Sequence, residues 1–321
     1  MKADVPESLA GLKHFLAISD LTPKALADLI DFCIQRKRQF QQGQLKPMLP
    51  GKVLAMIFQK ASLRTRLGFE AAMVQLGGHA INLEDYQIGL TKREDVRDVA
   101  RVISSMCDGI MARVFGHQLV VELARFSKVP VINGLSDFSH PCQALTDLTT
   151  IKEKLGTLEG LKVAYIGDAY NVARSLLNAC VLMGMNFTIA GPPGYQFSAG
   201  DLEAARMLAG PSATAIVQTE SPAEAARDAD ILYTDIWTSM GQENEKQQRE
   251  KALAAYRIDA DLLKLAKPTA LVMHCLPAHR NMEITDEVID GPQSIIFDQA
   301  ENRLHCQRAL LELLLGSASR V

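Results

Sequence analysis

The sequence predicts an α/β protein made of two doubly wound parallel-sheet domains that are joined by interdomain helices. Two observations predict this fold class. Short apolar runs typical of buried strands alternate with helical patterns along nearly the whole chain, which favours βαβ units and therefore parallel sheets. The chain has 321 residues, 48% of them hydrophobic and 22% charged, which suits two domains that each bury an apolar core.

The first domain is expected over residues 1–140. The predicted strands and helices, in chain order, are a strand at 52–58, a helix at 64–76, a strand at 109–114, a helix at 117–126 and a strand at 129–134. A long helix is expected to begin near Pro141, because proline suits the first helical position, and to end at Gly156. This helix joins the two domains.

The second domain is expected over residues 141–321. Six apolar runs predict its strands: 161–169, 187–192, 214–219, 230–237, 270–276 and 293–298. The closing helix, at about 299–316, is expected to pack back on the first domain. The polar stretch 241–251 is open to two interpretations, a mobile lid or the exposed face of a helix.

Charge and cysteine usage limit the classes of partner. The net charge of -3 does not indicate a nucleic acid or an anionic membrane surface as partner. No stretch approaches the ~20 apolar residues of a membrane span, and the N-terminal segment has no apolar signal core. The six cysteines are scattered without a CxxC pair, which predicts reduced thiols in the cytoplasm rather than disulfides or a zinc site.

The stretch KASLRTRLGFE combines two arginines with two hydroxyl groups just after a predicted strand. The first turn of a helix leaves backbone N–H groups unpaired and carries a partial positive charge. Adding Ser62, Arg64, Thr65 and Arg66 makes a site for a doubly charged oxyanion such as phosphate. Taken alone, the same residues are also explained by an ordinary N-cap with arginines on a solvated face.

Three more stretches place polar side chains at the ends of predicted elements. In HPCQ, His140 precedes a helix and Gln143 lies in its first turn. In MHCLPAHR, Cys275 ends a strand, and in DIWTSMG, Asp235 and Ser239 follow one. Open α/β sheets hold ligands at that edge. Capping residues and a buried structural cysteine are the simpler alternatives for each stretch alone.

Together, these stretches resemble the aspartate/ornithine carbamoyltransferase family, and within it the ornithine branch. The resemblance runs in family order through SLRTRLGFE, QLGGHAINL, DVARVISSM, VINGLSDFSHPCQAL, GDAYNVARS, DIWTSMGQE, MHCLPAHRNMEITDEVIDGPQS and FDQAENRLHCQ. It implies an enzyme that converts carbamoyl phosphate and L-ornithine to L-citrulline and phosphate, without metal or organic cofactor. It also implies a homotrimer with shared active sites, in arginine biosynthesis or in the reverse direction.

The resemblance implies a role for particular residues of a carbamoyl phosphate site. Ser62, Arg64, Thr65 and the backbone N–H of Leu63 would bind the phosphate, while Arg66 supports the turn through ion pairing. The other members of the site are Gln87 (lent to a neighbouring subunit), Arg113, His140, Gln143, Cys275, Leu276 (through its carbonyl) and Arg303. Arg113, His140 and Cys275 are the implied catalytic residues, with Arg113, His140 and Thr65 stabilising the developing oxyanion.

The resemblance also implies an ornithine site formed by Asn171, Asp235, Ser239 and Met240. Asp235 can pair with a free α-ammonium, and Asn171 with backbone N–H groups near Ser239 and Met240 can hold the α-carboxylate. The thiol of Cys275 can lie near the δ-nitrogen. An acylated ornithine lacks the α-ammonium, so this set favours ornithine itself.

Two residues depart from the family pattern, and two alternatives stay open. Leu63 replaces the usual threonine, which removes a hydroxyl worth roughly 1.5–3 kcal/mol to a charged group, and Gln299 replaces a common glutamate. Leucine at this place is also similar to relatives that act on N-acylated ornithine, so that substrate or putrescine is one alternative. A catalytically weak binding or regulatory paralogue is the other. GDAYN does not supply the glycine fingerprint of a nicotinamide enzyme.

Overall fold

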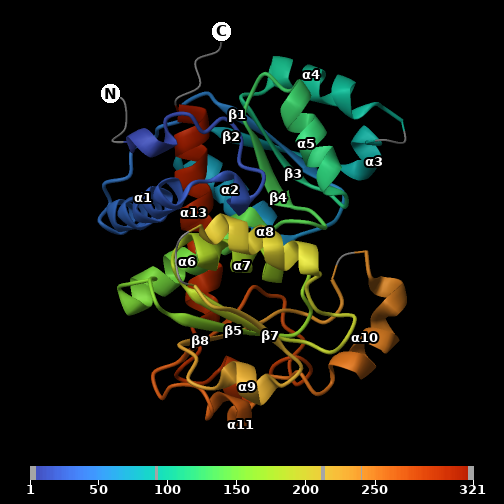
Figure 1. Cartoon of the computed structure of the whole chain (residues 1–321). Coiled ribbons are helices and arrows are strands. Elements are labelled where there is room, and N and C mark those ends of the chain that lie inside the picture. The colour runs from blue at the N-terminus through green and yellow to red at the C-terminus, as the bar shows by residue number, and fades with distance from the viewer. Residues whose placement is uncertain (1–4, 91–92, 211–213, 240, 317–321) are drawn as a thin grey trace. The chain divides into compact units, whose positions relative to one another are not determined.

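The structure is a computed structural model that describes residues 5–90, 93–210, 214–239 and 241–316 (Figure 1). The chain divides into two compact units, Met1–Thr149 with Asn302–Val321, and Thr150–Glu301. By compactness, the division falls within helices α6 (Pro141–Leu155) and α13 (Ile296–Gly316). The first part of α6 and the part of α13 from Asn302 onward belong to the first unit, and the expected domain boundary after residue 140 stays a prediction.

The first unit is built on a four-stranded parallel sheet in the order β2-β1-β3-β4. Its strands are β1 (Val53–Phe58), β2 (His79–Glu84), β3 (Gly109–Arg113) and β4 (Val131–Leu135). Its helices, apart from α6 and α13, are α1 (Pro23–Gln41), α2 (Leu63–Gln75), α3 (Asp85–Ile88), α4 (Val96–Met106) and α5 (His117–Phe126). The strand order reverses between β1 and β3, and open sheets bind ligands at the carboxyl ends of strands at such a point.

Helices cover both faces of this sheet (Figure 1). On one face, Val99 of α4 and Leu123 of α5 pack in a core that includes Ile57 and Ile110 of the strands. On the other, α13 lies so close to β3 that a Cβ atom added at Gly109 would come 3.0 Å from a methyl group of Leu315. The first unit is therefore doubly wound, as the sequence predicts.

The second unit contains a five-stranded parallel sheet in the order β7-β6-β5-β8-β9. Its strands are β5 (Lys162–Ile166), β6 (Asn186–Ala190), β7 (Ile216–Thr219), β8 (Ile231–Thr234) and β9 (Leu271–His274). Its other helices are α7 (Asn171–Leu182), α8 (Ala199–Ala209), α9 (Pro222–Ala226), α10 (Lys246–Leu253), α11 (Ala260–Leu263) and α12 (Asp286–Ile289). The strand order reverses between β5 and β8, which places the second switch point at their carboxyl ends.

The predicted sixth strand of this unit, at 293–298, is wrong. Only Ser294 makes an isolated bridge, to Val272, and helix α13 begins at Ile296 inside the apolar run. Periodicity cannot separate a strand from the start of a helix in so short a run. The polar stretch 241–251 contains a 3-10 turn (Glu243–Glu245) and most of α10. Within the described ranges, no helix has the length and apolar character needed to cross a bilayer.

A buried ion pair joins α1 to the C-terminal part of α13 within the first unit. Arg36 Nε lies 2.9 Å from both carboxylate oxygens of Glu312, and the two side chains are 8% and 2% exposed. Nearby, Arg308 donates to Gln75 Oε1 at 2.8 Å. Removing one partner of a buried pair leaves the other charge uncompensated, which is the costly case.

We therefore expect Glu312→Ala to destabilise the first unit by about 3–5 kcal/mol, because it leaves the Arg36 guanidinium buried without its carboxylate. Urea unfolding followed by far-UV circular dichroism measures the loss. Lys264→Ala is the matched control, because Lys264 pairs with Asp261 at 2.8 Å with side chains 73% and 90% exposed. Its cost should be much smaller, because both partners are exposed and water screens the pair. Equal costs for the two variants would contradict the importance of the buried pair.

Candidate active site

The turn from β1 into α2 has the strand–turn–helix geometry that an oxyanion site needs. Ser62 is the N-cap residue of α2, and its Oγ accepts a hydrogen bond from the Thr65 N–H at 3.4 Å. Leu63 opens the helix with its side chain 72% exposed, whereas Thr65 is buried. The first turn of α2 directs backbone N–H groups and a partial positive charge toward the carboxyl edge of the sheet.

Thr65 is the centre of a buried polar cluster. Its Oγ1 accepts hydrogen bonds from Arg303 Nη2 at 3.1 Å and from Arg113 Nη1 at 3.5 Å. Arg303 Nη1 also donates to Gln143 Oε1 at 2.5 Å, and Gln143 Nε2 donates to Asp147 Oδ1 at 2.7 Å. The structure thus brings together side chains from α2, the end of β3, α6 and α13, all within the first unit.

His140 lies directly before α6 and is buried. Burial holds the pKa of its imidazole well below the ordinary value, and the positive charges of Arg303, Arg113 and Arg64 lower this pKa further. The ring is therefore neutral at physiological pH, and it can exchange hydrogen bonds with a ligand without adding charge. Three predicted arginines thus act on one buried ring.

Two other predicted residues of the first unit, Arg66 and Gln87, make their contacts outside the Thr65 cluster. Arg66 forms the expected ion pair, with Nε 2.9 Å from Glu70 Oε1 on the exposed side of α2. Gln87 lies in α3 and is exposed, and its Oε1 accepts a hydrogen bond from the Glu84 N–H at 2.8 Å. In the described part of the chain, Gln87 bonds to Glu84 and, through its carbonyl, to Arg93, and neither residue belongs to the Thr65 cluster.

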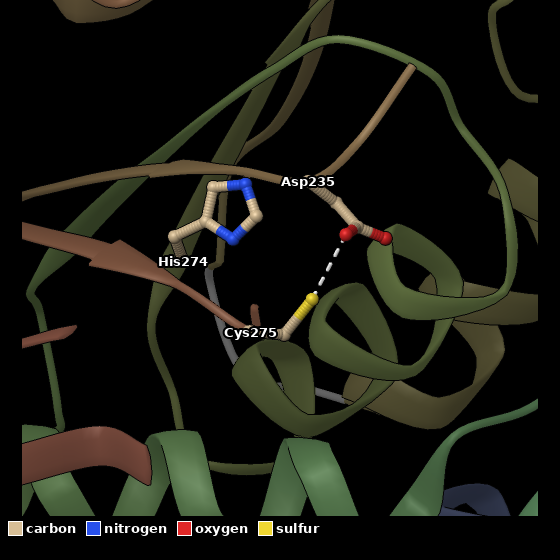
Figure 2. A group of neighbouring side chains, drawn as sticks. All are labelled: Asp235, His274 and Cys275. Carbon is tan, nitrogen blue, oxygen red and sulfur yellow. Dashed lines mark hydrogen bonds between the residues drawn. The ribbon is translucent and has the colours of Figure 1, made fainter. Parts of the chain in front are cut away.

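The second unit holds the other predicted residues at the carboxyl edge of its own sheet. Asn171 begins α7, Asp235 follows β8 and Cys275 follows β9. The Cys275 thiol donates to Asp235 Oδ1 at 2.9 Å, as Figure 2 shows, and the Ile236 N–H donates to the same oxygen at 2.8 Å. Burial raises the pKa of the Asp235 carboxyl, and the nearby His274 and these hydrogen bonds counteract part of that rise.

The remaining predicted residues of this unit lie in the adjoining loops. The Ser239 N–H donates to Gln242 Oε1 at 2.9 Å, and Met240 lies outside the described residues. Leu276 adopts a left-handed backbone with φ of 56°, which is uncommon for a residue with a side chain. Its N–H donates to His274 Nδ1 at 2.8 Å, which fixes the direction of the backbone after Cys275.

Asp235, His274 and Cys275 also form a possible metal-ligand set, because one donor atom of each lies within 4.8 Å of the others (Figure 2). Both ring nitrogens of His274 are already used, however. Nδ1 accepts from Leu276, and Nε2 lies 3.2 Å from Glu283 Oε1. A metal ion would have to replace one of these bonds, so the three side chains fit a hydrogen-bonded cluster better than a metal centre.

The sequence interpretation missed the support behind Cys275. Glu283 is fully buried, and its Oε1 lies within hydrogen-bonding distance of both His274 Nε2 and the His279 N–H. His274 and Glu283 belong to the same stretch as Cys275, MHCLPAHRNME, and this closeness in sequence was the available signal. Their role could not be assigned without knowing that the chain turns back after Pro277.

Two family models match consecutive parts of the chain. Residues 13–153 match the carbamoyl-P binding domain of aspartate/ornithine carbamoyltransferase, and residues 159–314 match the Asp/Orn binding domain. Among curated relatives, ornithine carbamoyltransferase of Pyrococcus abyssi is 48% identical over 309 residues, which is 96% of this chain and 97% of the relative. The protein of Pyrococcus furiosus named "Ornithine carbamoyltransferase, anabolic" is 47% identical over 96% of this chain and 98% of its own.

Solved structures give the same picture. Ornithine carbamoyltransferase from Pyrococcus furiosus superposes with a TM-score of 0.94 and 46% identity, covering 98% of this chain and all of the other. An N-acetyl-L-ornithine transcarbamylase has a TM-score of 0.83 and 30% identity, covering 94% of this chain and 100% of the other. The fold is thus shared with both, and the sequence is more similar to the structure whose name contains ornithine without an acetyl group.

Arg64 and Arg66 provide a matched test of the oxyanion site, because they lie two residues apart on α2. The charge of Arg64 reaches His140, whereas Arg66 pairs with Glu70 in solvent. We expect Arg64→Met to weaken binding of inorganic phosphate at least roughly tenfold, and Arg66→Met to change it less than about threefold. Isothermal titration calorimetry measures both. An equal loss in the two variants would place the anion elsewhere.

Proposed function

This chain belongs to the aspartate/ornithine carbamoyltransferase family, and we propose that it transfers the carbamoyl group of carbamoyl phosphate to L-ornithine, giving L-citrulline and phosphate. The observation that carries the choice of ornithine is the Asp235–Cys275 pair at the switch point of the second sheet. A carboxylate there suits a free α-ammonium, which acylated ornithines lack. The 48% identity to a curated ornithine carbamoyltransferase supports the same substrate.

Carbamoyl phosphate binds at the Thr65 cluster in this proposal. Ser62, Arg64, Thr65 and the backbone N–H of Leu63 hold the phosphate at the start of α2. Replacing the usual threonine with Leu63 should cost little affinity for phosphate, because the Leu63 side chain is exposed. The buried hydroxyl beside Arg113 and Arg303 is that of Thr65. The site would thus keep its main hydroxyl and its cationic groups.

The carbamoyl group is held by the groups that follow β3, precede α6 and lie on α13. Arg113, His140 and Thr65 polarise its carbonyl, and Gln143 and Arg303 orient the amide. A neutral His140 suits this role, because it donates a hydrogen bond to a developing oxyanion and then keeps its proton. Fixed donors aimed at the developing charge are commonly the largest catalytic contribution.

Ornithine binds in the second unit. Asp235 pairs with the α-ammonium, and Asn171 at the N-terminus of α7 holds the α-carboxylate with backbone groups near Ser239 and Met240. Cys275 lies beside the δ-nitrogen. The raised pKa of Asp235 predicts that ornithine binding weakens as pH falls through the pKa of this carboxyl, because the protonated form no longer attracts the ammonium.

The reaction needs no dedicated base. The lone pair of the neutral δ-nitrogen attacks the carbamoyl carbon, and a C–N bond forms as the C–O bond to phosphate breaks. The electron pair of that bond goes to phosphate, which also accepts the proton released by the amine. Alignment of the two reactants then supplies much of the acceleration.

The same residues also bear on two alternative functions. An enzyme for N-acylated ornithine or putrescine would leave Asp235 without the α-ammonium, and the solved N-acetyl-L-ornithine transcarbamylase is only 30% identical. A catalytically weak regulatory paralogue is disfavoured because Arg64, Arg113, His140 and Cys275 are all retained. Neither alternative explains the Asp235–Cys275 pair as well as ornithine does.

We also propose a homotrimer in which Gln87 completes the site of a neighbouring subunit. Five exposed apolar side chains lie on α2, β2 and α3, in the same part of the first unit as Gln87: Leu63 (72%), Leu67 (60%), Val74 (69%), Ile81 (41%) and Tyr86 (82%). An apolar surface of this kind favours contact with another protein surface. Strand β2 lies at the edge of its sheet, where a second copy can approach.

The working direction of the reaction and its location in the cell are also proposals. The relative named anabolic supports synthesis of citrulline, and so arginine biosynthesis, as the working direction. The scattered cysteines of the sequence, without a CxxC pair, favour the reducing cytoplasm.

The substrate assignment predicts a clear order of amines. With carbamoyl phosphate, L-ornithine should exceed N-acetylornithine, N-succinylornithine and putrescine in kcat/KM by orders of magnitude, and a colorimetric assay of the ureido product measures this. Asp235→Asn should lower kcat/KM for ornithine at least roughly tenfold and should change the value for putrescine much less, because putrescine has no α-ammonium. Preference for an acylated ornithine or putrescine would overturn the assignment.

The trimer predicts a mass in solution of three times the 35.1 kDa of one chain. Leu67→Glu should dissociate it, because a charge would replace an apolar side chain at the contact. Met207→Glu is the control, since Met207 is 76% exposed on α8 of the other unit, and it should leave the trimer intact. Light scattering after size-exclusion chromatography measures the mass. An active monomeric parent protein would exclude the shared site.

A further inference from the structure

Helix α10 carries a buried arginine although most of its surface is polar and exposed. Arg249 and Leu253 are its buried residues, and they lie four residues apart on one helix face. Leu253 packs in the apolar core of the second unit, whereas Arg249 points a cation inward. Arginine is seldom buried unless it is paired, so the partners of Arg249 show what this helix holds.

Each of the three nitrogen atoms of the Arg249 guanidinium donates a hydrogen bond. Nε donates to the Trp237 carbonyl at 2.7 Å, Nη1 donates to Glu245 Oε2 at 3.1 Å, and Nη2 donates to Asp168 Oδ2. The guanidinium also lies 5.0 Å from the centre of the Tyr195 ring, a cation–π distance. Asp168, Tyr195 and Trp237 follow β5, β6 and β8 at the carboxyl edge of the sheet.

These contacts lie on the segments that carry the proposed ornithine residues. Asp168 belongs to the turn that leads into Asn171, and Trp237 lies between Asp235 and Ser239. We propose that Arg249 is a positioning residue of the amine half-site: through Asp168 and the Trp237 carbonyl it ties the turn before α7 to the Asp235–Ser239 segment. This inference rests on the proposed function for its substrate and on the contacts for its geometry.

The charge of Asp168 supports a positional rather than a stabilising role. Its side chain is 14% exposed, and burial raises its pKa to about 6; the charges of Arg249 and Arg174 lower this pKa and that of Asp235 raises it. A carboxyl whose pKa is higher in the folded state loses stability as pH rises between the two pKa values. Ionisation of Asp168 thus costs the fold some stability relative to the protonated carboxyl, yet the ionised form is the one that pairs with the Arg249 guanidinium.

The test compares Arg249→Met with Arg206→Met, which removes an exposed arginine of α8 whose side chain is 55% exposed. Arg249→Met should raise the KM for ornithine roughly 10- to 100-fold and leave the KM for carbamoyl phosphate within about threefold. Glu245→Gln should have little effect, because the Asp168 and Trp237 contacts remain. Arg206→Met should match the parent. An unchanged ornithine KM in Arg249→Met, with a parent that uses ornithine, would overturn the inference.

Trp237 gives a second measurement that does not depend on catalysis, because it is the single tryptophan of the chain and is 6% exposed. Arg249→Met and Asp168→Asn should each make its fluorescence more easily quenched by acrylamide. In the parent the fluorescence should titrate with a midpoint near the Asp168 pKa of about 6, and Asp168→Asn should lose that step. Fluorescence unchanged in folded Asp168→Asn would also overturn the inference.

The kinetic and the fluorescence measurements distinguish failure of the proposed function from failure of the role of Arg249. A parent protein that prefers another amine would overturn the proposed function, while the tryptophan measurements would still decide whether Arg249 positions these segments. A parent that uses ornithine with unchanged variants would overturn only the role of Arg249.

Discussion

Concentration of positive charge around one buried hydroxyl is the central physical constraint in the first unit. Arg113 and Arg303 both donate to Thr65 Oγ1, although they lie 48 and 238 residues away in the sequence. Such charges are costly to bury without partners, so the threonine hydroxyl, Gln143 and the start of α2 together form a site complementary to an anion. Burial, together with these positive charges, holds the pKa of His140 well below its ordinary value and leaves the imidazole as a neutral hydrogen-bonding group.

The second unit applies the opposite electrostatics with the same topology. Its candidate residues also lie where the strand order reverses, but the central group is a carboxylate, Asp235, whose pKa is raised by burial. A cationic substrate would restore its charge. The central group is thus cationic in the first unit and anionic in the second, as expected for a protein that binds one anion and one amine.

The supporting residues explain why these groups keep their positions. His274 and Glu283 fix the backbone that follows Cys275, and Arg249 links the loops after three strands. Each of these side chains makes several buried polar contacts with its neighbours, and such contacts restrict the arrangements that the loops can adopt. The chemical groups of the site are thus held by neighbours that do not have to touch the substrate.

The sequence alone determined the α/β class and eight of the nine predicted strands, because their apolar runs are local patterns. The strand-edge places of Ser62, Asp235 and Cys275 follow from the same local patterns. The failed strand at 293–298 depended on contacts made far along the chain, which local periodicity does not contain. Only the tertiary structure decided that Arg303 meets Thr65, that Leu63 is exposed and that Arg249 is buried. Local patterns cannot predict side-chain burial or pKa, because both depend on neighbours that are distant in sequence and meet only when the chain folds.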